Sequence, residues 1–219
     1  MTGVASFASL PRPVLHYITA REQFPGREEE RRQALLNKVA EAARAGVSMV
    51  QVREKDLGGR ELEQLSRSLR SAFVEAQTGP GFFVINSRPD IALSVAADGV
   101  HLPSDGLSVS QVRKIWSAAG FGRPALVGVS CHTLPEVAKA AEDGADYVVF
   151  GPVFSKGTTP GIGLKTLADA CRHRIPVLAL GGVTLENAPA CIAAGAAGVA
   201  GIRLFQDNDV AEVVLRLRG

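Results

Sequence analysis

The 219-residue sequence predicts a single α/β domain, a closed (β/α)8 TIM barrel with a parallel eight-stranded sheet. Apolar, β-branched runs alternate eight times with amphipathic stretches. Runs such as YVVFG and VLALGG are continuously apolar, which is typical of parallel strands covered by helices on both faces. A small-residue helix end that leads into a strand recurs about every 50 residues, or every two strand–helix units. An open, doubly wound sheet is the alternative topology.

Each strand is expected at one of the apolar runs. The second reads VSMVQVR, and the others share its enrichment in β-branched and aromatic residues. The expected strands are 14–19, 47–53, 82–86, 99–102, 125–130, 147–151, 176–180 and 198–202.

Each helix is expected where apolar residues recur at helical spacing, as with Leu62, Leu65, Leu69 and Phe73. A Ser or Thr cap marks two of the starts, at Ser108 and Thr133, and proline in the first turn marks those of 89–96 and 133–142. The expected helices are 28–44, 60–76, 89–96, 108–116, 133–142, 164–173, 184–194 and 210–218.

Composition excludes several classes of protein. A net charge of +2 and an aromatic content of 5% argue against a nucleic-acid surface. Three dispersed cysteines exclude a disulfide framework and fit a reducing compartment. With no signal peptide or membrane span in the pattern, we expect a cytoplasmic protein whose partner is a small-molecule phosphate; a homodimer is left open. Residues 1–13 are expected as a flexible N-terminal arm before a barrel domain at 14–219.

The end of the second strand carries an amide and two cations. Gln51, Arg53 and Lys55 alternate along the strand, so they point the same way, into the barrel mouth. Such a trio is costly inside a barrel unless an anionic ligand or nearby carboxylates satisfy it. We therefore interpret it as substrate-binding, and the alternative is an internal salt bridge to Glu54 or Asp56.

Other strand ends supply candidate catalytic residues. His132 follows the fifth strand, where a histidine could act as a general acid or base. Ser130 ends that strand, Asn86 ends the third, and both could position a substrate ring. His101, on the fourth strand, is a less direct candidate because its side chain could lie within the barrel layer.

Two glycine-rich segments indicate phosphate binding. Barrels of this type often hold phosphate between the loops after strands seven and eight, where glycines let amides approach an anion. The expected phosphate-binding residues are Gly181, Gly182, Gly201, Ile202 and Arg203; a plain tight turn is the alternative for the glycine pair. The long loop after the sixth strand, with Lys156 and Gly163, is expected to clamp the ligand.

Taken together, the strand ends QVREK, INSRPDIAL, ADGVHLPSD, GVSCHT, GADYVVFGPVF, VLALGGVT and GAAGVAGI resemble the thiamine-phosphate synthase and thiazole tautomerase (TenI-like) superfamily over residues 14–205. The resemblance implies a barrel that binds a thiazole phosphate. Synthases join a pyrimidine pyrophosphate to it with magnesium and release pyrophosphate. Tautomerases aromatise a thiazole phosphate precursor by proton transfer without a metal.

The resemblance points to both branches. Gln51, Arg53 and Lys55 are similar to the synthase group that contacts the pyrimidine pyrophosphate. Synthases usually have Asn-Asp after the third strand, with the Asp on magnesium, whereas this chain has Ser87 in that place. Asp105 stays as a metal ligand only in the synthase interpretation. Ser104, within LPS, is similar to the tautomerase branch and is expected to contact substrate. The loop after GPVF also departs from the synthase pattern.

The leading hypothesis is therefore an enzyme of thiamine biosynthesis, a TenI-like tautomerase that needs no cofactor, with His132, Ser130 and Asn86 as the catalytic set. The first alternative is a thiamine-phosphate synthase that uses Mg²⁺. The second is a non-catalytic barrel that binds a phosphate ligand, and a purely structural barrel would leave the inward trio unexplained.

Overall fold

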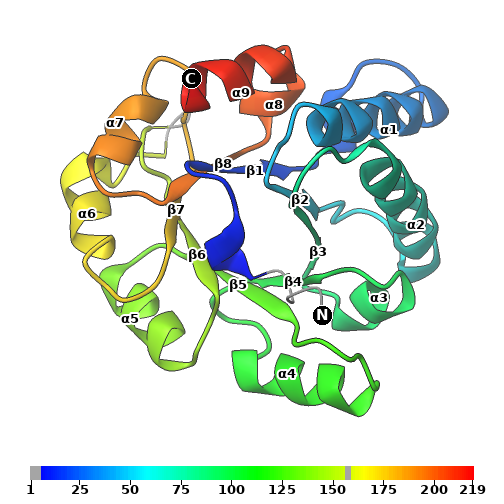
Figure 1. Cartoon of the computed structure of the whole chain (residues 1–219), viewed down its shortest axis with the longest axis horizontal. Coiled ribbons are helices and arrows are strands. Elements are labelled where there is room, and N and C mark those ends of the chain that lie inside the picture. The colour runs from blue at the N-terminus through cyan, green and yellow to red at the C-terminus, as the bar shows by residue number, and fades with distance from the viewer. Residues whose placement is uncertain (1–5, 156–158) are drawn as a thin grey trace.

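The protein folds as a closed barrel of eight parallel strands, which Figure 1 shows surrounded by helices. The computed structural model describes residues 6–155 and 159–219. Strands pair in chain order, and β8 closes on β1, with Val14 opposite Gly198. The predicted (β/α)8 fold is confirmed, and the open sheet is excluded.

The strands occupy the expected runs. They are β1 (Val14–Ile18), β2 (Met49–Val52), β3 (Phe82–Asn86), β4 (Gly99–Leu102), β5 (Leu126–Cys131), β6 (Tyr147–Phe150), β7 (Val177–Ala179) and β8 (Gly198–Gly201).

The helices cover the outside of the barrel. They are α1 (Glu28–Arg44), α2 (Gly59–Ala76), α3 (Pro89–Ser94), α4 (Val109–Ala118), α5 (Leu134–Glu142), α6 (Gly163–Ala170), α7 (Ala188–Ala193), α8 (Arg203–Gln206) and α9 (Val210–Arg218). Both predicted caps are confirmed, because the side chains of Ser108 and Thr133 accept hydrogen bonds from the first turns of α4 and α5.

Three short elements of the described chain were not predicted from the sequence. The helix α8 and two 3₁₀ turns, η1 (Phe7–Ser9) and η2 (Arg21–Gln23), are too short to show an amphipathic period. The expected helix 184–194 is shorter in the structure, because Thr184 begins a turn in which its amide donates to Asn187 at 2.8 Å.

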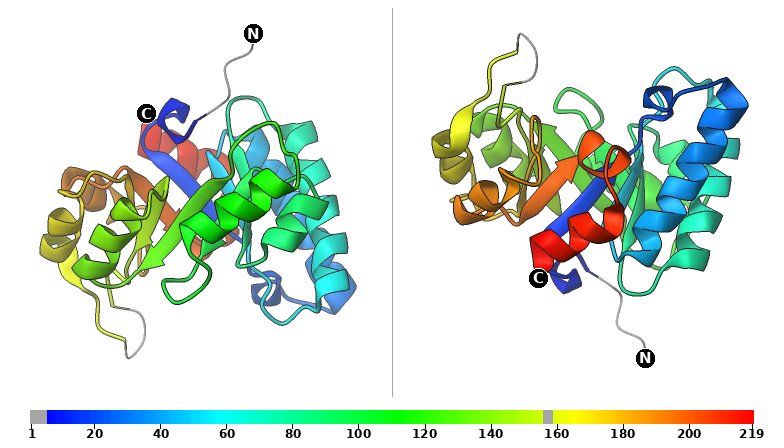
Figure 2. Two further views of the ribbon diagram at one scale, coloured as in Figure 1. Left: turned by 90° about the horizontal axis from the view of Figure 1, so that it is seen from below. Right: turned by 90° about the horizontal axis from the view of Figure 1, so that it is seen from above.

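Residues 6–13 differ from the flexible arm that the sequence predicts. Phe7 and Leu10 are only 5% and 3% exposed, and the Phe7 ring stacks on Tyr147 with centroids 5.1 Å apart. Figure 2 shows η1 and the C-terminus at one end of the barrel and η2 at the other. The segment packs because the narrow interior exposes apolar side chains at this end, and covering them stabilises the fold. Residues 1–5 of the expected arm lie outside the described residues.

The barrel has two hydrophobic cores. The larger one lies between the sheet and the helices. The smaller one fills the interior at the η1 end, with Phe7, Met49, Leu126, Leu178 and others. Apart from His16 and Tyr147, the polar side chains of the barrel interior lie above this apolar plug, toward the carboxyl ends of the strands.

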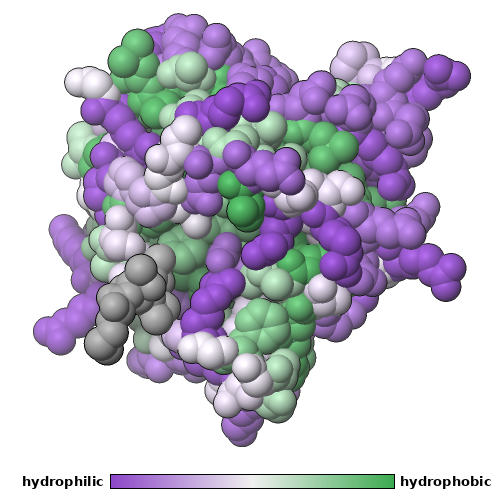
Figure 3. Space-filling view, turned by 45° about the vertical axis from the view of Figure 1, so that its right-hand side comes forward, coloured by the Kyte–Doolittle hydropathy of each residue, from purple (hydrophilic) through white to green (hydrophobic). Residues whose placement is uncertain are grey.

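The surface is largely hydrophilic where it can be seen. Figure 3 shows a face on which hydrophilic residues predominate and hydrophobic ones form separate patches. Within the described part of the chain, no helix combines the length and apolar character that crossing a membrane requires.

The tight strand packing yields a stability prediction. A Cβ on Gly99, at the start of β4, would lie 1.8 Å from the carbonyl oxygen of Leu126 on β5, where only backbone could give way. We expect Gly99→Ala to lower the free energy of unfolding by about 3 kcal/mol or more, in chemical denaturation. Gly122→Ala is the control, because its Cβ would meet nothing within 4 Å. Equal stability of the two variants would contradict the packing.

Candidate active site

A large cavity opens at the carboxyl ends of the strands. Its volume is about 1150 Å³, and every strand or the residue just after it contributes to the lining. Catalytic sites of (β/α)8 enzymes are found at this end of the barrel. Ligand pockets commonly have about 300–1000 Å³, so this cavity can hold more than one small molecule.

Most of the predicted site residues line this one cavity. They are Gln51, Arg53, Lys55, Asn86, Ser104, Asp105, Ser130, His132, Gly181, Gly182, Gly201, Ile202 and Arg203. Gly163, in contrast, is not among the lining residues that the structure describes; its amide instead donates to the carbonyl of Val153 at 3.0 Å. Lys156 lies outside the described residues.

An ion-pair network holds the loop that carries the two cations. Arg21, 4% exposed, is paired with Glu54 at 3.1 Å and also with Glu28 and Asp56. The hydrogen bonds that Arg21 donates to Asp56 hold the pKa of Asp56 below its usual range and raise the pKa of Arg21. Burial raises the pKa of Glu54, although bonds from Thr19 and Arg21 partly offset the effect.

This network bears on the two interpretations of Gln51, Arg53 and Lys55. Glu54 and Asp56, the carboxylates that could have neutralised the trio, are bound to Arg21 instead. Across residues 6–155 and 159–219, no salt bridge involves Arg53 or Lys55. The two cations therefore face the cavity without a protein counter-ion, which favours an anionic ligand there.

A chain of amides lies beside the cations. Gln51 donates from Nε2 to Asn86 Oδ1 at 3.0 Å, and Asn86 donates from Nδ2 to Ser87 Oγ at 3.1 Å. Ser87 has a φ of 59°, in the left-handed region, while its amide donates to the carbonyl of His101. Aspartate and asparagine adopt this conformation more readily than most other residues.

His132 has a defined orientation. Its Nδ1 lies 2.6 Å from the carbonyl oxygen of Gly151, which can only accept, so Nδ1 carries a proton. The backbone amides of His132 and Thr133 both donate to Glu136. Burial works to raise the pKa of that carboxyl, but these bonds outweigh it, and the pKa is lowered. With the proton on Nδ1 held by Gly151, Nε2 is the ring nitrogen left to contact a ligand.

After β7 and β8, backbone amides are available in the cavity lining. Gly181 and Gly182 have φ of 92° and 66°, and a Cβ on them would lie 2.5 Å from Pro152 and 2.8 Å from Phe154. Neither their amides nor that of Ile202 donates to any atom of the described chain. Asn187 fixes the loop by donating to the carbonyl of Gly182 at 2.9 Å. Converging amides of this kind suit a phosphate.

Three polar residues of the barrel interior form a buried chain that leads to the cavity. His101 Nε2 lies 2.8 Å from Ser130 Oγ, and its Nδ1 lies 3.2 Å from the Tyr147 hydroxyl. Burial and then the charge of Arg53 lower the pKa of His101 to about 3, so the ring is neutral. Tyr147 and Arg21 were not expected as site residues, because long-range pairing leaves no local sequence signal.

Protein ligands for a metal are sparse. In the described part of the chain, no three His, Cys, Asp or Glu side chains gather in a way that could hold an ion. Asp105, the carboxylate expected as a metal ligand, lines the large cavity, and so does Ser87.

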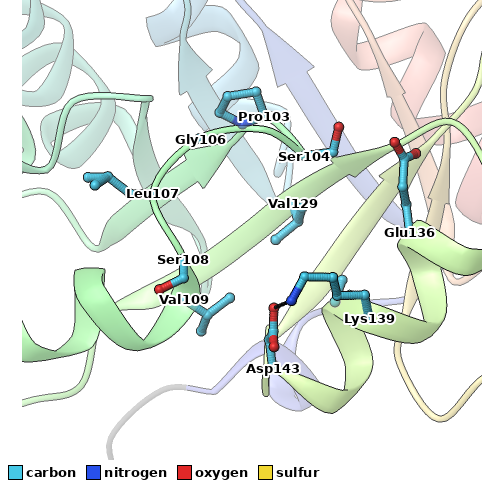
Figure 4. A pocket seen from close by; sticks show the side chains of 11 residues that line it. Pro103, Ser104, Gly106, Leu107, Ser108, Val109, Val129, Glu136, Lys139 and Asp143 are labelled. Carbon is cyan, nitrogen blue, oxygen red and sulfur yellow. Dashed lines mark hydrogen bonds and ion pairs between the residues drawn. The ribbon is translucent and has the colours of Figure 1, made fainter.

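A second, smaller pocket lies beside the loop before α4 and the helix α5. Figure 4 shows Pro103 and Leu107 on one side and Lys139, paired with Asp143, on the other. Its volume of about 110 Å³ is too small for a phosphorylated heterocycle, so the large cavity is the candidate active site.

Comparisons with known proteins agree with this geometry. The family model for thiamine monophosphate synthase matches residues 17–205. The thiamine-phosphate synthase of Chlorobium luteolum is 38% identical over 194 residues, which cover 86% of this chain and 82% of that protein. That of Syntrophomonas wolfei is 35% identical over 210 residues, covering 93% and 94%.

Solved structures extend the comparison. A thiamine phosphate pyrophosphorylase from Pyrococcus furiosus aligns with a TM-score of 0.77 and 29% identity over 94% of each chain. A 3-hexulose-6-phosphate synthase aligns with a TM-score of 0.63 at 20% identity, which is a likeness of fold alone. The matched span includes the strand ends that build the cavity, and the chain belongs to the thiamine monophosphate synthase family.

Proposed function

We propose that the protein is a thiamine-phosphate synthase, which couples a hydroxymethylpyrimidine pyrophosphate to a thiazole phosphate. The observation that carries this proposal is the pair of anion-binding regions in one cavity. Arg53 and Lys55 lie at the end of β2 without protein counter-ions, and the amides of Gly182 and Ile202 lie in the same cavity after β7 and β8, with β1 between β8 and β2. A synthase binds two phosphorylated substrates together, whereas a tautomerase binds one.

This ranking reverses the order expected from the sequence. The family model and the relatives named above favour the synthase over the tautomerase. The tautomerase stays as the second candidate because of Ser87 and the free Nε2 of His132, which could move a proton.

In the proposed reaction, the methylene carbon attached to the pyrimidine undergoes substitution. Its C–O bond to pyrophosphate breaks, the bonding electrons leave with pyrophosphate, and the thiazole nitrogen forms the new C–N bond. Arg53 and Lys55 would stabilise the charge that develops on the leaving group. The amides after β7 and β8 would hold the thiazole phosphate, so that its ring nitrogen faces the pyrimidine carbon.

Magnesium fits this site only as a weakly held ion. Asp105 would supply one carboxylate, and the remaining ligands would be water and pyrophosphate oxygens, an arrangement that magnesium accepts. Asn86 Oδ1 already accepts from Gln51, and Ser87 Oγ accepts from Asn86, so each oxygen has one of its two lone pairs engaged. A bound ion would neutralise charge on the pyrophosphate.

The two anion-binding regions can be separated kinetically. A Cβ at position 182 would displace the loop, so Gly182→Ala is expected to raise KM for the thiazole phosphate about tenfold or more and to leave KM for the pyrimidine pyrophosphate within about twofold. Arg53→Met should show the opposite pattern. Steady-state assays of thiamine phosphate formation measure both.

Gly144→Ala is the control for backbone strain, because Gly144 has a φ of 77° with open space around its Cβ position, away from the cavity lining. Both KM values should be unchanged in this variant. If Gly182→Ala and Arg53→Met instead raise the same KM, a single anion-binding region is indicated, and the proposal fails.

The metal requirement gives a further prediction. Ser87→Asp restores a carboxylate at a left-handed position that aspartate tolerates. The magnesium concentration for half-maximal activity should fall about tenfold, which corresponds to about 1.4 kcal/mol of binding free energy. Ser87→Asn relieves the backbone strain without adding charge, so it should leave this concentration unchanged. Activity that EDTA does not reduce in either variant would contradict the magnesium assignment.

His132 discriminates between the two candidate reactions. The synthase reaction needs no proton transfer to form its new bond, so His132→Asn should lower kcat for thiamine phosphate by less than about tenfold. A tautomerase that uses this residue as its acid or base should lose about 10²–10⁴-fold. Tautomerisation that falls by this factor, in a protein that forms no thiamine phosphate, would promote the second candidate.

A further inference from the structure

The buried chain Tyr147–His101–Ser130 joins the barrel interior to the cavity through three adjacent strands. Tyr147 is on β6, Ser130 on β5 and His101 on β4. His101 and Ser130 both line the cavity, but His101 is buried whereas Ser130 is partly exposed. His101 is 2% exposed and Tyr147 is 0% exposed. His101 therefore has little direct access to a ligand and would act through Ser130.

Neighbouring residues of the barrel hold Tyr147 in place. A Cβ on Gly128 would lie 2.1 Å from the Tyr147 ring, so only glycine leaves room for the ring at that point. Phe7 stacks on Tyr147 from the apolar plug, with an interplanar angle of 8°. The Tyr147 hydroxyl is thus held against His101, with the edge of His16 as a further neighbour at a centroid distance of 5.7 Å.

The direction of the hydrogen bonds follows from counting protons. A neutral imidazole has one N–H, so one ring nitrogen donates and the other accepts. In the described chain, the Tyr147 hydroxyl has no hydrogen-bond partner besides His101 Nδ1. If Nδ1 carried the proton, the phenol O–H would be buried without an acceptor, which disfavours that arrangement by a factor of about 10 to 100. The phenol therefore donates to Nδ1, and the proton of His101 is on Nε2.

We propose that His101 is the positioning residue for Ser130, and that the direction of this chain leaves the serine hydroxyl as a donor toward the cavity. His101 Nε2–H donates to Ser130 Oγ, which leaves the serine proton to point into the cavity. The group it meets must be an acceptor, such as a pyrophosphate oxygen or a ring nitrogen of the pyrimidine substrate. This assignment of the substrate rests on the proposed function, whereas the direction of the hydrogen bonds does not.

The position of Ser130 indicates which substrate it meets. It lies on β5, in the half of the cavity formed by β2 to β5, which also contains Gln51, Arg53 and Asn86. The amides assigned to the thiazole phosphate follow β7 and β8. Loss of the Ser130 donor should therefore weaken productive binding of the pyrimidine pyrophosphate rather than that of the thiazole phosphate.

Nitrogen NMR of protein labelled with ¹⁵N-histidine tests the direction without any substrate. The wild-type spectrum should show His101 protonated on Nε2 and bare on Nδ1, with the signal assigned by its loss in His101→Asn. Tyr147→Phe removes the phenol donor, so the two tautomers should become mixed. Protonation of His101 on Nδ1 in the wild type would overturn the inference.

Two substitutions of His101 then separate its two nitrogens. The amide of asparagine reaches the position of Nδ1, so His101→Asn loses the donor to Ser130. The amide of glutamine reaches the position of Nε2, so His101→Gln can keep that donor. We expect kcat/KM for the pyrimidine pyrophosphate to fall about tenfold in His101→Asn and to be within about threefold of the wild type in His101→Gln.

A double-mutant cycle with Ser130→Ala completes the test. Once the hydroxyl is absent, His101→Asn should lower kcat/KM by no more than about twofold, because its effect passes through Ser130. Equal, additive losses in both backgrounds would show that His101 acts only on the fold and would overturn the positioning role. If no thiamine phosphate forms while NMR shows the Nε2–H tautomer, the proposed function fails and the direction of the chain stands.

Discussion

The alternation of side chains along strands in a closed barrel is the constraint on which the site depends. Each inward residue of one strand meets the inward residues of its neighbours, because eight strands leave little interior space. On β2 the alternation places Met49 in the apolar plug, Gln51 above it and Arg53 at the mouth. A shift of one residue would exchange these side chains with Val50, Val52 and Glu54.

The outward residue of the same segment is as important as the inward ones. Glu54 points away from the cavity and binds Arg21, which also binds Asp56. Arg21 and Glu54 are buried, and their ion pair helps to hold the loop. The ion pairs of Arg21 also occupy the carboxylates that would otherwise neutralise Arg53 and Lys55. The segment QVREK at 51–55 thus contains both Glu54, which anchors the loop, and the unpaired cations Arg53 and Lys55. Because Glu54 is paired with Arg21, its charge does not neutralise these two cations.

Strand ends could be predicted from the sequence because their signal is local. Apolar runs fixed the eight strands, and the rule that function lies at their carboxyl ends selected residues such as Arg53, Ser130 and Gly182, which the structure brings to one cavity. Pairing across the barrel could not be predicted. The contacts of Tyr147 with His101 and of Arg21 with Glu54 join residues 46 and 33 positions apart. The burial of Phe7 likewise depends on the shape of the barrel end and not on its neighbours in the chain.

The sequence alone does not separate the two branches of the superfamily, because it shows which residues could bind the metal but not the size of the cavity around them. Ser87 in place of an aspartate argues against a strong magnesium site, and in the structure its hydroxyl accepts a hydrogen bond from Asn86. A weak metal site, however, does not remove the second anion-binding region. Arg53 and Lys55 supply positive charge that does not depend on a metal, at the place where a leaving pyrophosphate would need it. A cavity of about 1150 Å³ with cations after β2 and free amides after β7 and β8 is larger than a single phosphorylated thiazole requires. Charge and volume together therefore outweigh the loss of one carboxylate, and they favour a reaction between two bound phosphorylated substrates.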